Sequence, residues 1–260
     1  MGAKGGNPGL ATRLLALRLI ERVDEEGAWP SRMVAKEGDQ AGLSALDKAL
    51  VMQLVQTVLR RRPALEFVIA SCAKRGRVRP PVARVLALGL AQLLLLERIP
   101  DHAAVDLSVR AARRLGLHRQ VGLINGMLRR VARERAQWLE RIASAEDGRL
   151  AGPAPAWLWR RWVERFGLQA AAALQARLGE PPVMDARVDV DGLDHWCETL
   201  GATPLEGLPP MMVLPGGSPS RMPGFAEGAW SVQDRNAARI VPLLPPGGRR
   251  VADLCAAPGG

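Results

Sequence analysis

The chain has 260 residues, of which 48% are hydrophobic, and a formal net charge of +10. This length and hydrophobic share predict a globular, soluble protein with one large domain or two ordinary ones, which excludes a wholly disordered chain. The charge favours a polyanionic partner such as RNA, because cations that neutralise phosphates release counterions, although a compositional bias toward Arg would give the same charge.

Targeting and covalent cross-linking signals are missing from the sequence. The longest apolar run, Val85–Leu96, is too short to span a bilayer and is interrupted by Gln92. Cys72, Cys197 and Cys255 are odd in number and have no C-x-x-C spacing, which argues against a disulfide framework or a zinc site. We therefore expect a cytoplasmic protein with no membrane segment and no metal ion, and we expect it to be monomeric.

Helical periodicity dominates the chain up to about residue 145. A first helix is expected to begin at Asn7 and Pro8, and a second to begin at a capping box formed by Ser44 and Asp47. Further amphipathic helices are expected over residues 82–96, from about residue 102, and over 122–143. The pattern predicts an all-α domain at residues 1–145.

The composition changes after this point. The segment "EDGRLAGPAP" is expected to be a linker, followed by helices at 157–166 and 168–178. Alternating residues then predict strands at 183–190, in "PPMMVLPGG" and in "GAWSVQD", and a helix capped by Asp234. Residues 146–245 are therefore predicted to combine linker helices with an α+β region.

The last segment, "RRVADLCAAPGG", has the form of a strand that enters the first turn of a doubly wound α/β domain. It matches neither the dinucleotide fingerprint nor the phosphate-binding loop. An ordinary Pro-Gly loop explains its spacing equally well. Residues 246–260 are accordingly predicted to begin a Rossmann-like domain.

The segment "VADLCAAPGG" also resembles cofactor motif I of the RsmB/Nop2/Sun family of RNA cytosine-5 methyltransferases, and "SVQDRNAARIVPLL" resembles the lead-in to that motif. Farther upstream, "LERIPDHAAVDLSVRAARRLGLHRQVGLINGMLRRVARE" resembles the NusB-like RNA-binding domain of bacterial members that modify small-subunit (16S) rRNA. Asp189 stands where the family usually has Asn. The resemblance covers nearly the whole chain, with the motifs in the same order.

This resemblance implies S-adenosylmethionine as cofactor and small-subunit rRNA as partner. The residues implied to line the cofactor pocket are Cys255, Ala256, Ala257, Pro258, Gly259 and Gly260. The family adds a cysteine thiolate to carbon 6 of cytosine, and that cysteine comes from motifs downstream of motif I. We therefore expect the chain to be truncated within motif I, to contain no catalytic residue and to be inactive alone. A non-enzymatic NusB-like factor in transcription antitermination is the alternative.

Arginine clusters suggest where RNA would bind. They lie in "LRRRP" (59–63), "AKRGRVRPP" (73–81), "VRAARRLGLHRQ" (109–120) and "LRRVARER" (128–135). They are read either as phosphate contacts, with Arg60, Arg61, Arg113 and Arg114 the residues to test, or as solvated helix faces. Trp157 and Trp162 sit at helical spacing, which favours core positions over base stacking. His102 is expected to cap or orient a helix, and neither it nor His195 has a second metal ligand at workable spacing.

Overall fold

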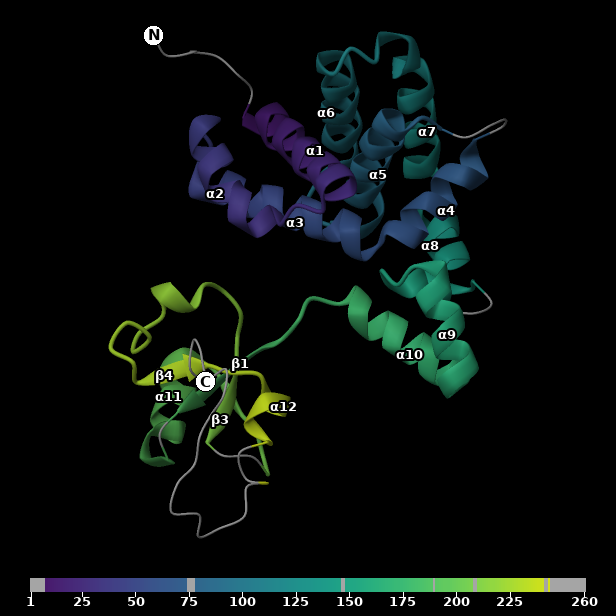
Figure 1. The fold of residues 1–260 in the computed structure, drawn as a ribbon. Coiled ribbons are helices and arrows are strands. Elements are labelled where there is room, and N and C mark those ends of the chain that lie inside the picture. The colour runs from purple at the N-terminus through teal and green to yellow at the C-terminus, as the bar shows by residue number, and fades with distance from the viewer. Residues whose placement is uncertain are drawn as a thin grey trace. The chain divides into compact units, whose positions relative to one another are not determined.

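The structure is a computed structural model that describes residues 8–73, 78–145, 148–188, 190–207, 210–240 and 243 (Figure 1). The chain divides into two compact units, Met1–Glu180 and Pro181–Gly260. Each unit has a hydrophobic core of its own. In the described ranges, no helix combines the length and the apolar character needed to cross a membrane.

The described part of the first unit is helical, which confirms the predicted all-α N-terminal region. Its helices are α1 (Pro8–Glu26), α2 (Pro30–Gln40), α3 (Ala45–Arg60), α4 (Arg62–Cys72), α5 (Pro80–Leu95), α6 (Asp101–Arg114), α7 (Val121–Arg133), α8 (Arg135–Ala143), α9 (Ala156–Phe166) and α10 (Leu168–Gly179), with 3-10 turns η1 (His118–Gln120) and η2 (Arg149–Ala151). Helices α2 and α4 were not predicted from the sequence, and α7 and α8 were predicted as one helix. Helices α9 and α10, expected within residues 146–245, lie in this first compact unit.

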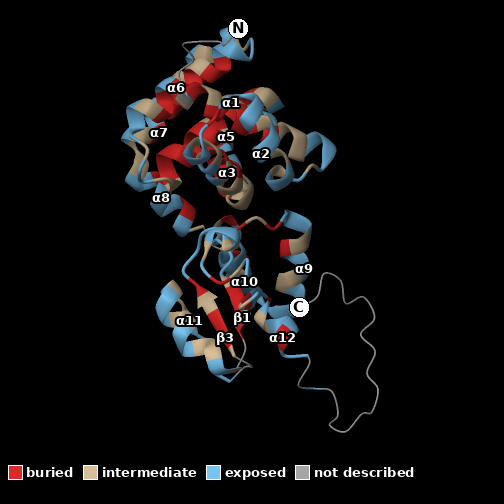
Figure 2. Ribbon diagram, turned by 90° about the vertical axis from the view of Figure 1, so that its left-hand side faces the viewer, coloured by how far each residue is buried: buried red, intermediate tan, exposed pale blue. Residues whose placement is uncertain are grey.

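Helix α5 forms the centre of the core (Figure 2). Between Val85 and Leu94 every residue except Ala87 is buried. The helix contacts α1, α3, α4, α6, α7 and α8, so most of its surface meets a neighbour. This explains the long apolar run in its sequence, because each fully buried Leu or Val contributes about 1.5–3 kcal/mol relative to exposure.

Gly89 is a point of close approach between α5 and two of its neighbours. A Cβ at this position would lie 2.8 Å from Leu128 Cδ1 on α7 and 3.0 Å from Ser108 Oγ on α6. Side-chain carbons do not tolerate separations this short without displacement. The missing side chain therefore sets how near α6 and α7 come to α5.

A buried polar pair interrupts the apolar surface of α5. Arg13 Nε donates to Gln92 Oε1 at 2.9 Å, and Gln92 Nε2 donates to the Leu88 carbonyl at 2.9 Å. Burial lowers the pKa of Arg13. Each polar group of Gln92 thus has a partner, which is why a glutamine can occupy the middle of the core.

Local capping chemistry fixes the start of α3 as predicted. Asp47 N donates to Ser44 Oγ at 3.1 Å, and Ser44 N donates to Asp47 Oδ2 at 3.3 Å. The two bonds satisfy backbone donors that the helix itself cannot satisfy. The predicted capping box is confirmed.

The segment before α9 is held in place by a side chain of α10. Gln175 is buried, and its Nε2 donates to the carbonyls of Arg149 and Gly152, both at 2.8 Å. Its Oε1 accepts from Ala154 N at 3.0 Å. The predicted linker is therefore an ordered turn where the structure describes it.

The second unit contains a small antiparallel sheet. Its strands are β1 (Met184–Val188), β2 (Thr203–Pro204), β3 (Met211–Leu214) and β4 (Trp230–Val232), in the order β2-β3-β1-β4. All of its pairings are antiparallel. The unit also contains α11 (Leu193–Leu200), α12 (Arg235–Ala238) and the 3-10 turns η3 (Val190–Gly192) and η4 (Pro219–Arg221).

The core of this unit lies where α11 meets the sheet. Trp230 is buried, and its Nε1 donates to the Pro223 carbonyl at 2.9 Å. Trp196 of α11 packs against the same cluster. Gly224 has a φ of +81°, and a Cβ there would collide with the indole of Trp196, so this turn requires glycine.

The predicted strands at 183–190, in "PPMMVLPGG" and in "GAWSVQD" correspond to β1, β3 and β4. Asp234 caps α12, as predicted, by accepting from Asn236 N at 2.8 Å and Ala237 N at 3.2 Å. The strand predicted at "RRVADLC" and the start of a Rossmann-like domain lie outside the described residues. The sheet that is described is antiparallel.

Candidate nucleic-acid interface

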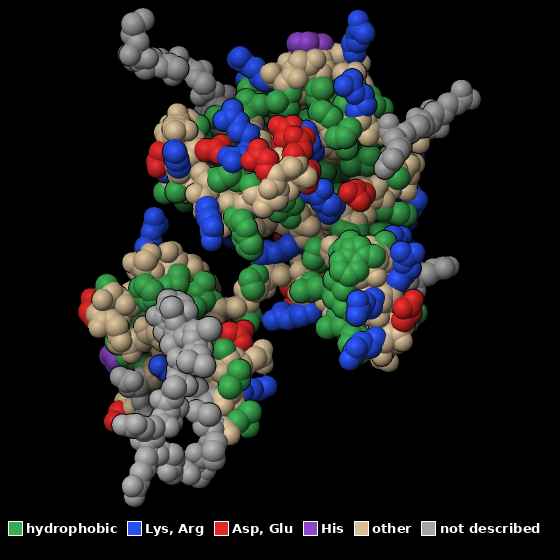
Figure 3. All heavy atoms as spheres, in the orientation of Figure 1, with side chains coloured by type: hydrophobic (Ala, Val, Ile, Leu, Met, Phe, Trp, Pro, Cys, Tyr) green, Lys and Arg blue, Asp and Glu red, His purple; other side chains and the backbone are tan. Residues whose placement is uncertain are grey.

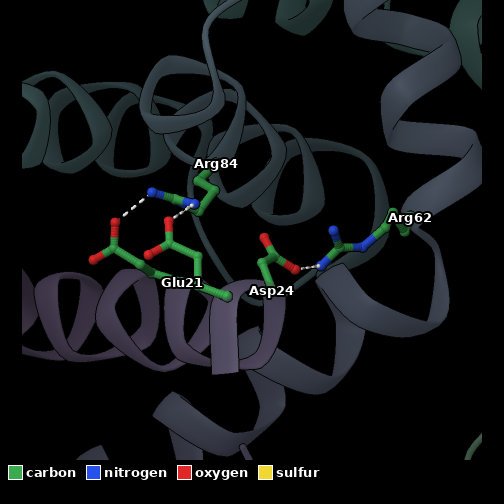
Figure 4. A network of polar contacts seen from close by, with 5 residues as sticks. Glu21, Asp24, Arg62 and Arg84 are labelled. Atoms are coloured by element: carbon green, nitrogen blue, oxygen red, sulfur yellow. Dashed lines mark hydrogen bonds and ion pairs between the residues drawn. The ribbon is translucent and has the colours of Figure 1, made fainter. Parts of the chain in front are cut away.

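Arginines at the corner of α1, α4 and α5 pair with acidic side chains of α1. Arg62 Nη2 donates to Asp24 Oδ1 at 2.6 Å, and Arg84 bonds both Glu21 and Glu25 (Figure 4). The side chain of Arg84 is only 11% exposed. Acidic groups near a helix C-terminus oppose the helix dipole, so the two arginines offset an unfavourable local charge. Their charge serves the packing of three helices.

The "LRRRP" cluster is therefore a weaker interface than its composition predicts. Arg62 is paired, and Arg61 is half-buried with no hydrogen-bond partner for its Nε. Burial lowers the pKa of Arg61. Arg60 alone of the three has neither an ion pair nor a buried guanidinium nitrogen in the part of the chain that the structure describes. Residues 74–77 of the "AKRGRVRPP" cluster, which include three of its four basic residues, lie outside the described residues.

A second group of arginines lies along α6, η1 and α7. Its members are exposed: Arg113, Arg114, Arg119, Arg129 and Arg133. None of them forms an ion pair with an acidic side chain among the described residues. Figure 3 shows basic side chains at the end of the unit where α6 turns into α7. These charges remain available to a ligand.

Three of these arginines line a groove of about 690 Å³ between α6 and α7. Arg113 comes from the end of α6, whereas Arg129 and Arg133 lie one turn apart on α7. Asn125 Oδ1 accepts from Arg129 Nε at 3.1 Å, which restrains that guanidinium within the groove. The apolar part of the lining includes Val105, Val109, Val121 and Ala132.

The charge balance of the groove is positive. Asp101 and Asp106 are the acidic residues among its lining side chains. Asp106 lies 3.6 Å from Arg110 Nη1, so part of its charge is already offset from outside the groove. A concave, arginine-lined surface of this kind suits phosphate groups, since Arg presents several donors in a planar fork.

His102 also lines this groove, but it does not cap α6. The helix begins at Asp101, and the N-cap residue, Pro100, makes no side-chain cap. His195 lies on α11 with its ring 4.9 Å from that of Trp196 in an edge-on arrangement. Across the described residues, no group of His, Cys, Asp and Glu side chains is arranged to hold a metal ion.

The structure describes two of the cysteines. Cys72 at the end of α4 and Cys197 in α11 are half-buried free thiols. Burial raises the pKa of each, which disfavours the thiolate form.

The residues expected to bind a cofactor, Cys255 to Gly260, lie outside the described residues, as does Asp189. Residues 231–240, the first part of the segment that leads toward them, are described and are anchored to β1. Asp185 accepts from Arg235 Nε at 2.7 Å and from Arg235 Nη2 at 2.6 Å. The hydrogen bonds from Arg235 lower the pKa of Asp185, whose side chain is 5% exposed.

Most of the helical region is similar to a known protein family. Residues 10–133 match the NusB family. The N-terminal part of the chain is therefore similar to this family. Both walls of the α6–α7 groove lie within the matched residues, whereas α9, α10 and the sheet lie beyond them.

The chain is also similar, over nearly its full length, to proteins named ribosomal RNA small subunit methyltransferase B. The one from Klebsiella pneumoniae is 36% identical over 95% of this chain and 58% of its own length. Those from Xanthomonas campestris and Xylella fastidiosa are each 34% identical, over 100% and 97% of this chain. The chain spans 58% to 59% of the length of these relatives.

Three features of the structure were not predicted from the sequence. The pairing of Arg84 with acids of α1 and the bond between Asp185 and Arg235 join residues far apart in the sequence, so no local pattern reveals them. Trp157, which was expected in the core, is 61% exposed, and that expectation is wrong. The three arginines that follow Trp157 in α9 were the sequence signal that could have indicated an exposed helix face.

Proposed function

We propose that the chain is the RNA-binding and cofactor-approach part of an S-adenosylmethionine-dependent RNA cytosine-5 methyltransferase acting on small-subunit rRNA in the cytoplasm. The similarity to the Klebsiella and Xanthomonas methyltransferases carries the proposal, because it covers 95% and 100% of the chain and so continues through the second unit. The proposal includes a monomeric chain and no metal ion.

A non-enzymatic RNA-binding factor is the second candidate, and the NusB match over residues 10–133 favours it. Such a factor would need only these matched residues. This chain adds α9, α10 and a four-stranded sheet, all within the stretch that is similar to the methyltransferases. We therefore prefer the enzyme.

In the proposed function the α6–α7 groove holds the RNA backbone. Arg113, Arg129 and Arg133 would contact phosphates, which positions an RNA without specifying its sequence. The bond between Asn125 and Arg129 reduces the freedom that the latter would lose on binding. Sequence selection is left to base contacts elsewhere.

The chemical step needs a cysteine thiolate, and we expect it to come from outside the described residues, because burial raises the pKa of both described cysteines. The proposal that S-adenosylmethionine binds at Cys255 to Gly260 rests on the sequence of that turn. We expect the 260-residue chain to bind rRNA and to transfer no methyl group by itself.

The test compares two versions of the protein. Methyl transfer from labelled S-adenosylmethionine to unmodified small-subunit rRNA is measured for the 260-residue chain and for a version extended to the length of its relatives. Label on carbon 5 of cytosine with the extended version alone is expected. No transfer by the extended version would contradict the enzyme, and transfer by the short chain would contradict the expected position of the nucleophile.

A further inference from the structure

Helix α9 carries an exposed indole and three arginines on one helix face. Trp157 is 61% exposed, and Arg160, Arg161 and Arg165 follow it at the spacings that place side chains on one helix face. All three arginines are exposed and form no ion pair with any residue that the structure describes. Glu164 is the single acidic residue of α9, so the face carries a net positive charge.

The surface beside this face is hollowed. A hollow of about 490 Å³ lies between α4 and the segment before α9, and its lining includes Phe67, Pro155 and Ala156. Ala156 is the first residue of α9 and directly precedes Trp157, so the first turn of α9 borders this hollow. Arg62 and Arg149 also line it.

The site is rigid where it meets the hollow. Gln175 fixes the segment from Arg149 to Ala154 through three hydrogen bonds of 2.8 to 3.0 Å. The segment leads directly into α9, so the first turn of that helix, including Trp157, has a defined position relative to α10 and the hollow. An ordered aromatic surface loses little conformational entropy when a ligand binds.

We infer that this face of α9 binds a single-stranded RNA nucleotide, with the base stacked on Trp157 and phosphates held by Arg160, Arg161 and Arg165. The inference rests on the proposed function and extends the RNA-binding surface beyond residues 10–133, the part that matches the NusB family. Aromatic rings combined with basic side chains are how proteins hold single strands without reading their sequence.

The net charge of the face favours a polyanion such as RNA. Its three exposed arginines outnumber the single acidic residue of α9, Glu164, and cations of this kind neutralise phosphates. The exposed indole also favours a single strand over a duplex, because only an unstacked base offers its face to a side chain.

The experiment measures binding of the 260-residue chain to a short unstructured RNA and to a duplex of the same sequence, by fluorescence anisotropy. We expect Trp157→Ala to weaken binding of the single strand by about 5- to 150-fold, the equivalent of one lost base stack, and to leave duplex binding unchanged. Trp157→Phe should keep most of the affinity, because it retains a ring. Arg160→Glu with Arg161→Glu should lower the salt dependence of single-strand binding.

Trp29 provides a matched control. It is 69% exposed, and the guanidinium of Arg32 lies 5.9 Å from its ring centre. Trp29→Ala should leave binding of the single strand unchanged. Circular dichroism of each variant shows whether its helical content is kept. Trp157→Leu, which keeps an apolar side chain, should bind the single strand as weakly as Trp157→Ala.

The outcomes separate this inference from the proposed function. If the parent chain binds RNA and the alanine and leucine variants at Trp157 bind it equally well, the α9 site is wrong while RNA binding by the groove stands. If those variants instead weaken association with the extended methyltransferase region, the face is a protein interface and the inference is overturned. A parent chain that binds neither probe contradicts both proposals.

Discussion

At the corner of α1, α4 and α5 arginines face carboxylates, whereas along α6 and α7 they face solvent. Arg84 and Arg62 are bonded to acids of α1, but Arg113, Arg129 and Arg133 line a groove without acidic partners among the described residues. All belong to one basic domain and lie in arginine-rich sequence. The difference shows that ion pairing, and not the number of arginines, distinguishes structural charge from charge that can bind a ligand.

Reversing the groove charges should have the largest effect. Replacing Arg113, Arg129 and Arg133 together by Glu should lower the slope of log affinity against log salt for rRNA fragments by about 2, because about 0.7 is lost per phosphate contact. The affinity itself should fall about tenfold or more. Filter binding across a salt series measures both quantities.

The same triple reversal at Arg32, Arg187 and Arg221 is the control, since these residues are exposed, lie outside the groove and give an equal change of net charge. An equal loss of affinity in this control would mean that overall charge, and not the groove, binds the RNA.

Removing a paired arginine should act on stability instead. Arg84→Gln leaves Glu21 and Glu25 without their partner and should lower the free energy of unfolding by about 1–2 kcal/mol. Chemical denaturation followed by circular dichroism measures this change. RNA affinity should stay as in the parent chain. A variant that folds normally but binds RNA weakly would show that Arg84, although paired with acidic residues, also takes part in RNA binding.

The ion pair between Arg235 and Asp185 in the second unit should make the stability of that unit depend on pH in the acid range. Arg235 lowers the pKa of Asp185, so the bond stabilises the fold above the unfolded-state pKa of about 3.9, and that contribution is lost as the pH falls through the lower, folded-state pKa. The protection of the β1 and β4 amides against hydrogen exchange, relative to the intrinsic exchange rate at each pH, should therefore fall below about pH 4.

Asp185→Asn should exchange faster already at neutral pH and lose this acid dependence. The same acid dependence in the Asn variant would show that another carboxyl group is responsible.

Releasing an arginine should have the smallest effect. Arg130 Nε bonds both carboxylate oxygens of Glu134 at 3.1 Å, one turn farther along the chain. Glu134→Gln should free this charge beside the groove and raise RNA affinity by about twofold, while stability changes by no more than about 0.5 kcal/mol. The amide can still accept from Trp138 Nε1, as the carboxylate does now. Unchanged or weaker binding would count against the groove as the site.

Local patterns predicted much of the fold. The capping box at Ser44, the apolar run of α5 and the alternation in β1, β3 and β4 all act over a few residues, and each prediction is confirmed. Helix α2 was missed because its sequence "PSRMVAKEGDQ" is mostly polar and packs few apolar residues inward. The break between α7 and α8 at Glu134 contains no Gly or Pro, so the sequence gives no local signal that one helix ends there.

The candidate site was less predictable. The sequence indicates that arginines cluster, but the partners of Arg62 and Arg84 lie far away along the chain and become neighbours only when the helices pack. Trp157 illustrates the converse. Its helical spacing suits either face of α9, and only the packing of α9 on α10 decides which face is buried.

The contact at Gly89 links the packing of the buried core to the geometry of the proposed RNA-binding groove. This residue lies against Ser108 of α6 and Leu128 of α7, the two helices whose opposite faces form the arginine groove. A methyl group at Gly89 would push at least one of these helices outward and change the distance across which Arg113 and Arg129 face each other. The width of a charged surface is thus set by a residue that has no side chain and no access to solvent.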